Sequence, residues 1–204
     1  MPNADFFATM GFFVVRGFLD PSACARLRGE VRAATPAPAT VRTDESTYDI
    51  DRSTRSTDLA DVTPESRTFV DRRLADVMPR VAAHYGFTLT GCERVQFLVY
   101  REGDFFRPHR DRADDEDAGS FSRQRRVAAV IFLNGEGDPS DAQSFQGGAL
   151  TFYGLFDRDD AEALGFPLES EEGLLVTFPT DVTHEVRPVE GGERNTVVTW
   201  FVGD

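Results

Sequence analysis

The sequence predicts a mainly β protein of the α+β class, in which N-terminal helices pack on the outside of one sheet. Two observations support this fold class. Helical periodicity is confined to residues before 87, and short apolar segments separated by Gly, Asn, Asp and Pro follow from there onward. Helices followed by many short strands favour an antiparallel sandwich or small barrel over alternating βαβ units. We expect one domain over residues 1–204, with a strand and supporting helices in 1–86 and the β core in 87–204.

The first elements are marked by apolar patterns and by a helix start signal. Residues 11–19 predict a strand, because most of the segment is apolar. A helix should follow over residues 23–34, since Asp20 can cap its first turn and Pro21 suits a helix start.

A second helix should begin at Pro64 or Glu65 and end near Tyr85. Its apolar residues recur at helical spacing, and Pro79 is expected to interrupt or kink it. His84, near its end, is expected to be a packing or helix C-terminal histidine.

Three connections are long and polar: residues 35–66, 112–125 and 134–147. Their composition is that of surface loops, and a segment folded over a functional site is the alternative. In the first connection, Arg52 and Arg55 are the candidates for contacts with such a site. The second follows directly on a His-x-Asp pair, and the second and third are candidate lids.

The β core is expected to consist of short apolar segments bounded by turn residues. These segments are residues 95–101, 105–109, 126–133, 149–153, 173–178, 182–186 and 195–202.

Composition narrows the functional classes. The net charge is −13 and none of the basic residues is lysine, which argues against general binding to nucleic acid or acidic membranes. Apolar runs are too short for a membrane span and no signal-peptide pattern is seen, so we expect a cytoplasmic protein. Cys24 and Cys92 are expected to be reduced structural thiols.

Three residues form a candidate metal site. His109 and Asp111 are two residues apart in an extended segment, so both side chains should point to one face. His184 lies in another predicted strand. Two histidines and one carboxylate form the facial triad of non-haem Fe(II) enzymes, which leaves coordination positions open.

Arg194 is a candidate anchor for an anionic cosubstrate, because a guanidinium can bind a carboxylate through two hydrogen bonds. We expect residues 182–186 and 195–202 to pair through a turn at Gly191 and Gly192, which would place Arg194 beside His184. Strand alternation should put further side chains on the face of Arg194. These are Thr196, Val198 and Trp200.

In these motifs the chain resembles the 2-oxoglutarate/Fe(II)-dependent dioxygenases, in particular the prolyl-hydroxylase-like branch. The resemblance covers residues 87–202, and it implies a double-stranded β-helix, or jelly-roll, core. The matching pieces are Tyr100…His109-Arg-Asp111, Arg125-Arg-Val-Ala-Ala-Val-Ile-Phe-Leu-Asn134, Gly147-Gly-Ala-Leu-Thr-Phe152 and Gly173-Leu-Leu-Val-Thr-Phe-Pro179…His184…Arg194…Trp200.

The resemblance implies roles for individual residues. His109, Asp111 and His184 match the iron ligands, and Arg194 matches the basic residue that pairs with the distal carboxylate of 2-oxoglutarate. Tyr100 matches a tyrosine that supports that carboxylate. Thr196 and Trp200 are further expected cosubstrate-pocket residues. Candidate substrate contacts are Arg125, Arg110 and Gln96, with Arg126 an alternative to Arg125.

Two positions depart from the family pattern. Leu150 stands where several relatives have threonine, and Phe132 where some have tyrosine. Two hydroxyl contacts to 2-oxoglutarate are therefore missing. Residues 155–172 form an insertion that matches no substrate subgroup.

The expected function is oxidative decarboxylation of 2-oxoglutarate coupled to hydroxylation of a substrate C–H bond. The expected cofactors are Fe(II), 2-oxoglutarate and O2, with ascorbate as a stimulant. The substrate is a prolyl residue in a protein or peptide, a free amino acid, or another small metabolite. A slow 2-oxoglutarate/O2 sensor and a metal-binding module without turnover are the alternatives. The oligomeric state stays open.

Overall fold

The computed structural model describes residues 3–42, 48–112, 121–141, 143–156 and 164–203. Its helices are α1 (Ala4–Thr9), α2 (Pro21–Ala33), α3 (Pro64–Tyr85) and a short 3-10 helix, η1 (Phe121–Gln124). All other regular elements in these ranges are strands, which form two main sheets and two small ones.

The larger main sheet has eight strands, in the order β1-β15-β10-β18-β8-β6-β2, with β7 also paired to β18. Its strands are β1 (Phe13–Val15), β2 (Ala37–Pro38), β6 (Asp58–Ala60), β7 (Leu89–Cys92), β8 (Gln96–Tyr100), β10 (Arg125–Phe132), β15 (Leu175–Pro179) and β18 (Arg194–Gly203).

The second main sheet has five strands, in the order β14-β13-β16-β9-β5. Its strands are β5 (Arg55–Ser56), β9 (Phe105–His109), β13 (Leu150–Phe152), β14 (Phe166–Leu168) and β16 (His184–Val186). The two small sheets join β11 (Gly135–Glu136), β12 (Ser144–Gly147) and β17 (Val189–Gly192), and β3 (Val41–Arg42) and β4 (Tyr48–Asp49).

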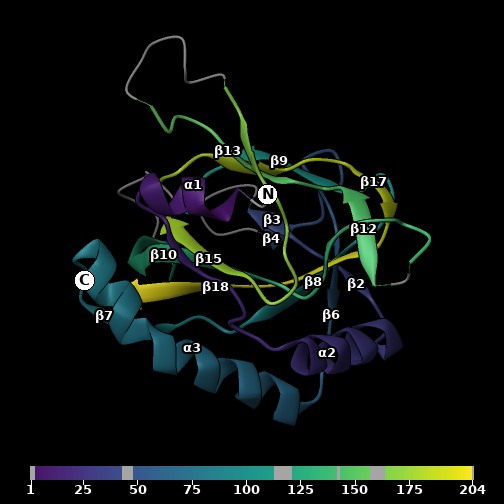
Figure 1. The fold of residues 1–204 in the computed structure, drawn as a ribbon, viewed down its shortest axis with the longest axis horizontal. Coiled ribbons are helices and arrows are strands. Elements are labelled where there is room, and N and C mark those ends of the chain that lie inside the picture. The colour runs from purple at the N-terminus through teal and green to yellow at the C-terminus, as the bar shows by residue number, and fades with distance from the viewer. Residues whose placement is uncertain (1–2, 43–47, 113–120, 142, 157–163, 204) are drawn as a thin grey trace.

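The molecule is layered, with helices α2 and α3 on one face of the eight-stranded sheet and the five-stranded sheet across its other face (Figure 1). Strand β8 shows how one strand contributes to the cores on both faces of this sheet. Phe97 and Val99 belong to the core under the helices, whereas the alternating residues Leu98 and Tyr100 belong to the core between the sheets. Side chains alternate across a strand, so one apolar strand serves two cores.

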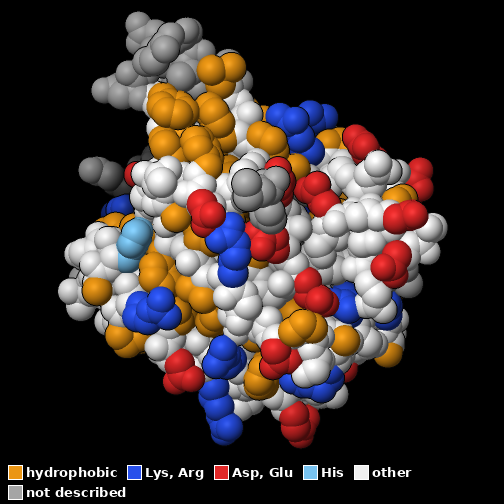
Figure 2. Space-filling view, viewed as in Figure 1, with side chains coloured by type: hydrophobic (Ala, Val, Ile, Leu, Met, Phe, Trp, Pro, Cys, Tyr) orange, Lys and Arg blue, Asp and Glu red, His pale blue; other side chains and the backbone are white. Residues whose placement is uncertain are grey.

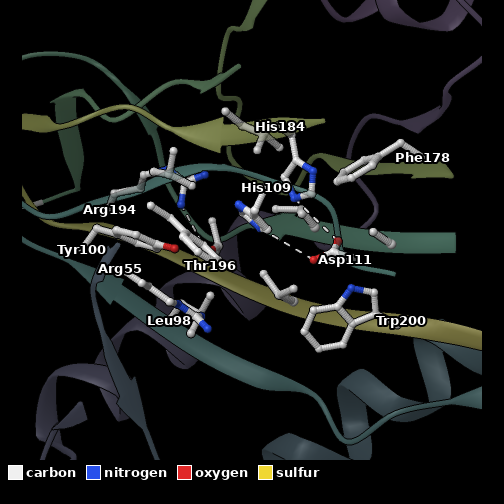
Figure 3. Close-up of a pocket in the computed structure, with 16 residues that line it drawn as sticks. Arg55, Leu98, Tyr100, His109, Asp111, Phe178, His184, Arg194, Thr196 and Trp200 are labelled. Carbon is white, nitrogen blue, oxygen red and sulfur yellow. Dashed lines mark hydrogen bonds and ion pairs between the residues drawn. The ribbon is translucent and has the colours of Figure 1, made fainter. Parts of the chain in front are cut away.

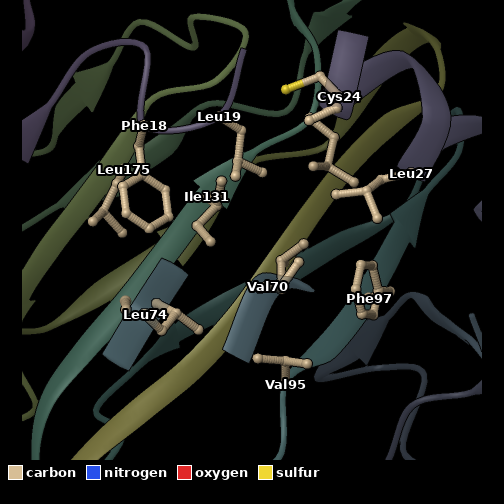
Figure 4. Close-up of a cluster of buried hydrophobic side chains, with 14 of the residues drawn as sticks. Phe18, Leu19, Cys24, Leu27, Val70, Leu74, Val95, Phe97, Ile131 and Leu175 are labelled. Carbon is tan, nitrogen blue, oxygen red and sulfur yellow. The ribbon is translucent and has the colours of Figure 1, made fainter. Parts of the chain in front are cut away.

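The helices have the ends that their sequences predict. The Asp20 carboxylate accepts a hydrogen bond from the Ala23 backbone N–H at 2.9 Å and caps α2. Helix α3 continues through Pro79 and ends at Tyr85. Its C-cap is Gly86, whose φ of 71° is a left-handed conformation that glycine adopts without strain. Leu27 of α2 and Leu74 of α3 are fully buried in the core under the helices (Figure 4).

The core between the sheets is rich in phenylalanine and adjoins the histidines. Phe12 and Phe178 both contact Phe152, with ring centres 4.7 and 4.9 Å apart. Phe7 of helix α1 packs on Phe152 at 5.3 Å. The Phe178 ring centre in turn lies 4.7 Å from that of His184, so this cluster supports one side of the candidate metal site.

One predicted pairing is wrong. The segments around His184 and Arg194 do not form a hairpin: β16 pairs with β13 and β9, and β18 pairs with β10, β8 and β7. Strand β17 lies between them in sequence and pairs with β12. His184 and Arg194 therefore come from facing sheets. Strand alternation along β18 is as predicted, since Arg194, Thr196, Val198 and Trp200 line one cavity.

Some regular elements were not predicted. Helix α1 precedes the first expected strand, strands β2–β6 lie in the connection over 35–66, and β14 lies in the insertion over 155–172. Most of residues 112–125, a candidate lid, lie outside the described residues.

The surface in Figure 2 mixes acidic and basic side chains, and hydrophobic side chains gather near one end. Phe156 and Leu164 are exposed in the part of the chain that the structure describes. None of the described helices is long and apolar enough to cross a membrane.

Candidate metal site and adjoining cavity

The two histidines of the predicted triad face each other across neighbouring strands. His184 of β16 is directly opposite His109 of β9. The Nδ1 of His109 lies 2.8 Å from the Arg107 carbonyl oxygen, and that of His184 lies 2.9 Å from the Val182 carbonyl oxygen. Carbonyls only accept, so each Nδ1 carries a proton, and in the neutral ring Nε2 then keeps a free lone pair. In both histidines Nε2 is therefore the nitrogen available to bind a metal ion.

Asp111 completes the group. Its Oδ1 lies 3.7 Å from Nε2 of His109, and its Oδ2 lies 3.6 Å from Nε2 of His184. One ligand atom from each of the three residues lies within 4.8 Å of the other two. Two imidazoles and a carboxylate at this spacing can hold one divalent ion of the kind that non-haem iron enzymes use.

The charge states of these groups suit a metal ligand set. Burial lowers the pKa of His109 to about 3, and the neighbouring His184 adds to that effect, so the ring is neutral near pH 7. Burial opposes ionisation of Asp111, yet His184 and His109 bring its pKa below the ordinary value. A neutral imidazole and an ionised carboxylate are the forms that bind metal.

Arg194 is a buried cation in the same cavity. Only 1% of its surface is exposed, and its guanidinium carbon lies 5.2 Å from the ring centres of both Tyr100 and Phe132. Its Nη1 donates to Thr196 Oγ1 at 3.4 Å, its Nε has no hydrogen-bond partner, and no described carboxylate forms an ion pair with it. Burial lowers the pKa of Arg194 to about 10, so it stays charged at neutral pH. A buried, unpaired charge of this kind is expensive unless a ligand neutralises it.

The triad and Arg194 share one open cavity. Figure 3 shows Arg194, Tyr100 and Thr196 at one end, Asp111 and Trp200 at the other, and the two histidines between them. The remaining lining is mostly apolar: Leu98, Phe106, Ala128, Val130, Leu150, Phe178, Val186 and Val198, with Arg55 as a second cation. A mainly apolar cavity with a few convergent polar groups is typical of small-ligand sites.

The expected substrate contacts lie elsewhere. Among the described residues, Arg125, Arg110, Arg126 and Gln96 are absent from the cavity lining. Arg125 forms a two-pronged ion pair with Glu93, with N–O distances of 2.6 and 2.7 Å. Arg110 Nε donates to Thr183 Oγ1 at 3.2 Å. A role for any of these four residues in substrate binding stays a prediction.

Arg55, one of the two arginines named from sequence as candidate contacts in the connection over residues 35–66, lines the cavity. Its guanidinium carbon lies 4.7 Å from the Phe106 ring centre, and the Phe106 ring stacks on His109 with centres 3.6 Å apart. The pairing of β5 with β9 places it there, with Arg55 opposite Phe106. Arg52 is not among the lining residues; it is paired with Asp58 at 3.2 Å. Sequence reasoning did not name Ala128 and Val130 of β10, which belong to the apolar lining of the cavity. Their alternation along a predicted strand would have placed both side chains on one face.

A comparison with family models places residues 95–202 in one family, described as the 2OG-Fe(II) oxygenase superfamily. The matched segment spans more than half of the chain and contains the triad, Tyr100 and Arg194. The chain belongs to the 2OG-Fe(II) oxygenase superfamily.

Relatives in sequence carry hydroxylase names. This 2OG-Fe(II) oxygenase is 30% identical over 140 residues to a PKHD-type hydroxylase of Maricaulis maris, a match covering 67% of this chain and 56% of the relative. It is 27% identical over 130 residues to a PKHD-type hydroxylase of Shewanella baltica, covering 61% of this chain and 51% of the relative. The chain thus spans about half the length of these relatives.

Solved structures show the same fold over nearly the whole chain. A prolyl-4-hydroxylase of Pseudomonas putida is 26% identical, with a TM-score of 0.72, and the match covers 98% of this chain and 96% of that one. A prolyl hydroxylase of Trichoplax adhaerens, solved with a peptide fragment of hypoxia inducible factor, is 17% identical with a TM-score of 0.72, covering 97% and 86%. The predicted jelly-roll fold and family resemblance are confirmed, and the family implies Fe(II), 2-oxoglutarate and O2 as cofactors.

Proposed function

We propose that this 2OG-Fe(II) oxygenase is a hydroxylase that couples oxidative decarboxylation of 2-oxoglutarate to hydroxylation of a substrate C–H bond. One observation carries the proposal. A triad that could hold a metal ion and a buried arginine with no acidic partner among the described residues line the same cavity. A metal-binding module alone has no need of the arginine, and a simple anion site has no need of the triad.

In this proposal His109, Asp111 and His184 hold Fe(II). The three ligand atoms are mutually close, and both imidazoles have their Nε2 lone pairs free because each Nδ1–H donates to a carbonyl. Three protein ligands leave coordination positions for a cosubstrate and O2. Bound Fe(II) and 2-oxoglutarate would supply the O2 chemistry, and the protein supplies orientation, charge and exclusion of water.

Arg194 would bind the distal carboxylate of 2-oxoglutarate. Its guanidinium is held between the Tyr100 and Phe132 rings, so little side-chain entropy remains to be lost on binding. Thr196 contacts the guanidinium and can add a hydroxyl to the same carboxylate. Leu150 and Phe132 bring no hydroxyl to the cavity, so the anchor depends on Arg194 and its two hydroxyl neighbours, Tyr100 and Thr196.

The proposed substrate is a prolyl residue in a peptide or protein, or a free amino acid. The name of the Pseudomonas putida structure supports the first of these. Arg55 extends the cavity lining from the segment before α3, with its Nε buried and unpaired, and provides a donor for a substrate carbonyl or carboxylate oxygen. Another small metabolite is the second candidate, because the lining is largely apolar.

The test loads the protein with Fe(II) without oxygen, adds 2-oxoglutarate and then O2, and follows succinate over a panel of amino acids and peptides. Succinate release that a panel member stimulates is the expected result. His109→Ala should abolish it by removing a ligand, whereas Arg194→Ala should keep metal binding and lose 2-oxoglutarate binding. Metal binding with no succinate under any condition would leave the metal-binding module as the better hypothesis. Slow release that no panel member stimulates would favour a sensor.

A further inference from the structure

Asp111 differs from the other two candidate ligands because no strand holds it. His109 ends β9 and His184 begins β16, but Asp111 lies in a bend beyond β9. Its backbone N–H donates to the Thr180 carbonyl at 3.0 Å, and the next residue, Arg112, donates to the same oxygen at 3.2 Å. Further restraint on the position of Asp111 must come from neighbouring side chains.

Arg125 supplies one such restraint. Its Nη1 donates to the Asp111 carbonyl oxygen at 3.4 Å. Its Nε and Nη2 donate to the two carboxylate oxygens of Glu93 at 2.6 and 2.7 Å. Parallel hydrogen bonds of this kind fix the plane of a guanidinium. Arg125 is thereby held at both ends, by an acid on one side and by the ligand-bearing bend on the other.

Trp200 contacts Arg125 and lies next to Asp111. The Arg125 guanidinium carbon lies 3.6 Å from the Trp200 ring centre, so the two groups stack. Its indole Nε1 is buried, has no partner of good geometry among the described residues, and faces the Asp111 carboxylate (Figure 3). Glu93 is tied to the same strand, because its N–H donates to the Trp200 carbonyl at 2.9 Å and its carbonyl accepts from Thr199 Oγ1 at 2.6 Å.

We infer that Glu93, Arg125 and Trp200 form a positioning assembly that holds Asp111 in place as a metal ligand. The inference rests on the proposed function, since it assigns a purpose to groups around the same triad. Arg125 is a positioning residue in this view and not a substrate contact. Its N–H groups point to Glu93 and Asp111, one face is covered by Trp200, and neither Arg125 nor Glu93 lines the cavity.

The test measures binding of Co(II), without oxygen and without cosubstrate, to the wild type and to Glu93→Gln and Arg125→Gln variants. We expect affinity to fall about 10–100-fold in both, the range typical for loss of a group that orients a metal ligand. The double variant should lose little more than either single one, because both changes break one unit. Arg125→Lys, which keeps the charge but not the paired hydrogen bonds, should fall between wild type and Arg125→Gln.

Arg126→Gln is the matched control. Arg126 lies next to Arg125 on β10, but its Nη1 donates to the Arg123 carbonyl at 2.8 Å and not to Asp111. Its Co(II) affinity should equal that of the wild type. Trp200 is the only tryptophan of the chain, so its fluorescence reports on the assembly directly. Glu93→Gln and Arg125→Gln should change the emission of the metal-free protein, and Arg126→Gln should not.

The outcomes separate the positioning role from its rivals. Unchanged Co(II) affinity in a folded Glu93→Gln variant would overturn the inference, and since that change is isosteric it serves even if Arg125→Gln does not fold. Normal Co(II) affinity with a raised KM for substrate in Arg125→Gln would instead make Arg125 a substrate contact. Failure of the proposed function looks different: the wild type itself would bind no Co(II), or His109→Ala would bind it equally well.

Discussion

His184 lies directly opposite His109 in the antiparallel pair of β16 and β9, with their ring centres 4.3 Å apart. Each ring is oriented by the same local device, a hydrogen bond from Nδ1 to the carbonyl two residues earlier, at Val182 and Arg107. Both Nε2 atoms therefore face Asp111, with N–O distances of 3.7 and 3.6 Å. Hydrogen bonds within the protein thus orient both rings of the candidate ligand set.

Removal of a single ligand should abolish tight metal binding. His109→Ala, His184→Ala and Asp111→Ala should each weaken Mn(II) affinity by more than about 100-fold, beyond what loss of an outer-shell group causes. Calorimetric titration without oxygen measures this. His84→Ala is the control, because this third histidine is on α3 and contacts the Gly11 carbonyl at 2.8 Å. Equal loss in His84→Ala would contradict the assignment.

The metal-free protein should lose stability in mild acid because of His109. Its pKa is about 3 in the folded state and about 6.5 when unfolded, so between these values the unfolded chain binds the extra proton. Stability is thus fully present above pH 6.5 and falls as the pH drops toward 3. One such group changes the free energy of unfolding by about 2 kcal/mol between pH 6.5 and 5. Asp111, with a lowered pKa, acts in the same direction below about pH 4.

Urea unfolding in the presence of a chelator, at pH 7.5 and pH 5, measures that difference. His109→Asn removes the titrating ring, so the stability of this variant should depend less on pH over the same interval. The other ionisable groups are present in both proteins, so the comparison isolates the contribution of residue 109. An unchanged difference in His109→Asn would show that burial of His109 is not its source.

Sequence patterns predicted well what depends on neighbouring residues. The strand over 105–109 has the predicted bounds, and α2 begins where Asp20 caps it. Patterns failed where pairing partners create the element. Strands β2, β5 and β6 have two or three residues each and exist because β6 pairs with β8 and β2, and β5 pairs with β9. Helix α1 has no side-chain cap, and its Phe7 is held by Phe12 and Phe152.

The candidate site was predicted as a set of residues but not as an arrangement. His109, Asp111, His184 and Arg194 do meet in one cavity. The assumed hairpin was wrong because the choice of partner strand is a long-range property that alternation along one strand cannot encode. Arg55 and Arg52 were both named as candidate contacts, but sequence could not choose between them, since the place of Arg55 depends on the pairing of β5 with β9.

Arg55 should affect substrate binding without affecting the metal. Its buried Nε has no partner, and its guanidinium stacks over Phe106, which covers His109. Arg55→Gln should raise the KM of any substrate that stimulates succinate release by about 10-fold or more, as for loss of a hydrogen bond from a charged donor. Arg52→Gln is the control from the same segment, because Arg52 is paired with Asp58 outside the cavity. Weaker Mn(II) binding in Arg55→Gln would point instead to a role in orienting His109.

Gly148→Ala should weaken 2-oxoglutarate binding through Arg194. A Cβ at Gly148 would lie 2.8 Å from Val189 Cγ2 and 3.1 Å from Arg194 Cδ, and the backbone φ of +64° adds strain for any side chain. Gly154→Ala separates the two effects, because Gly154 has a φ of +68° but open space around its Cβ. Both variants should unfold at a lower temperature than the wild type. Only Gly148→Ala should lose 2-oxoglutarate affinity, by about 10-fold if Arg194 loses one charged hydrogen bond. Titration of 2-oxoglutarate into the Mn(II) protein measures this, and equal affinities in the two variants would show that Arg194 tolerates the displacement.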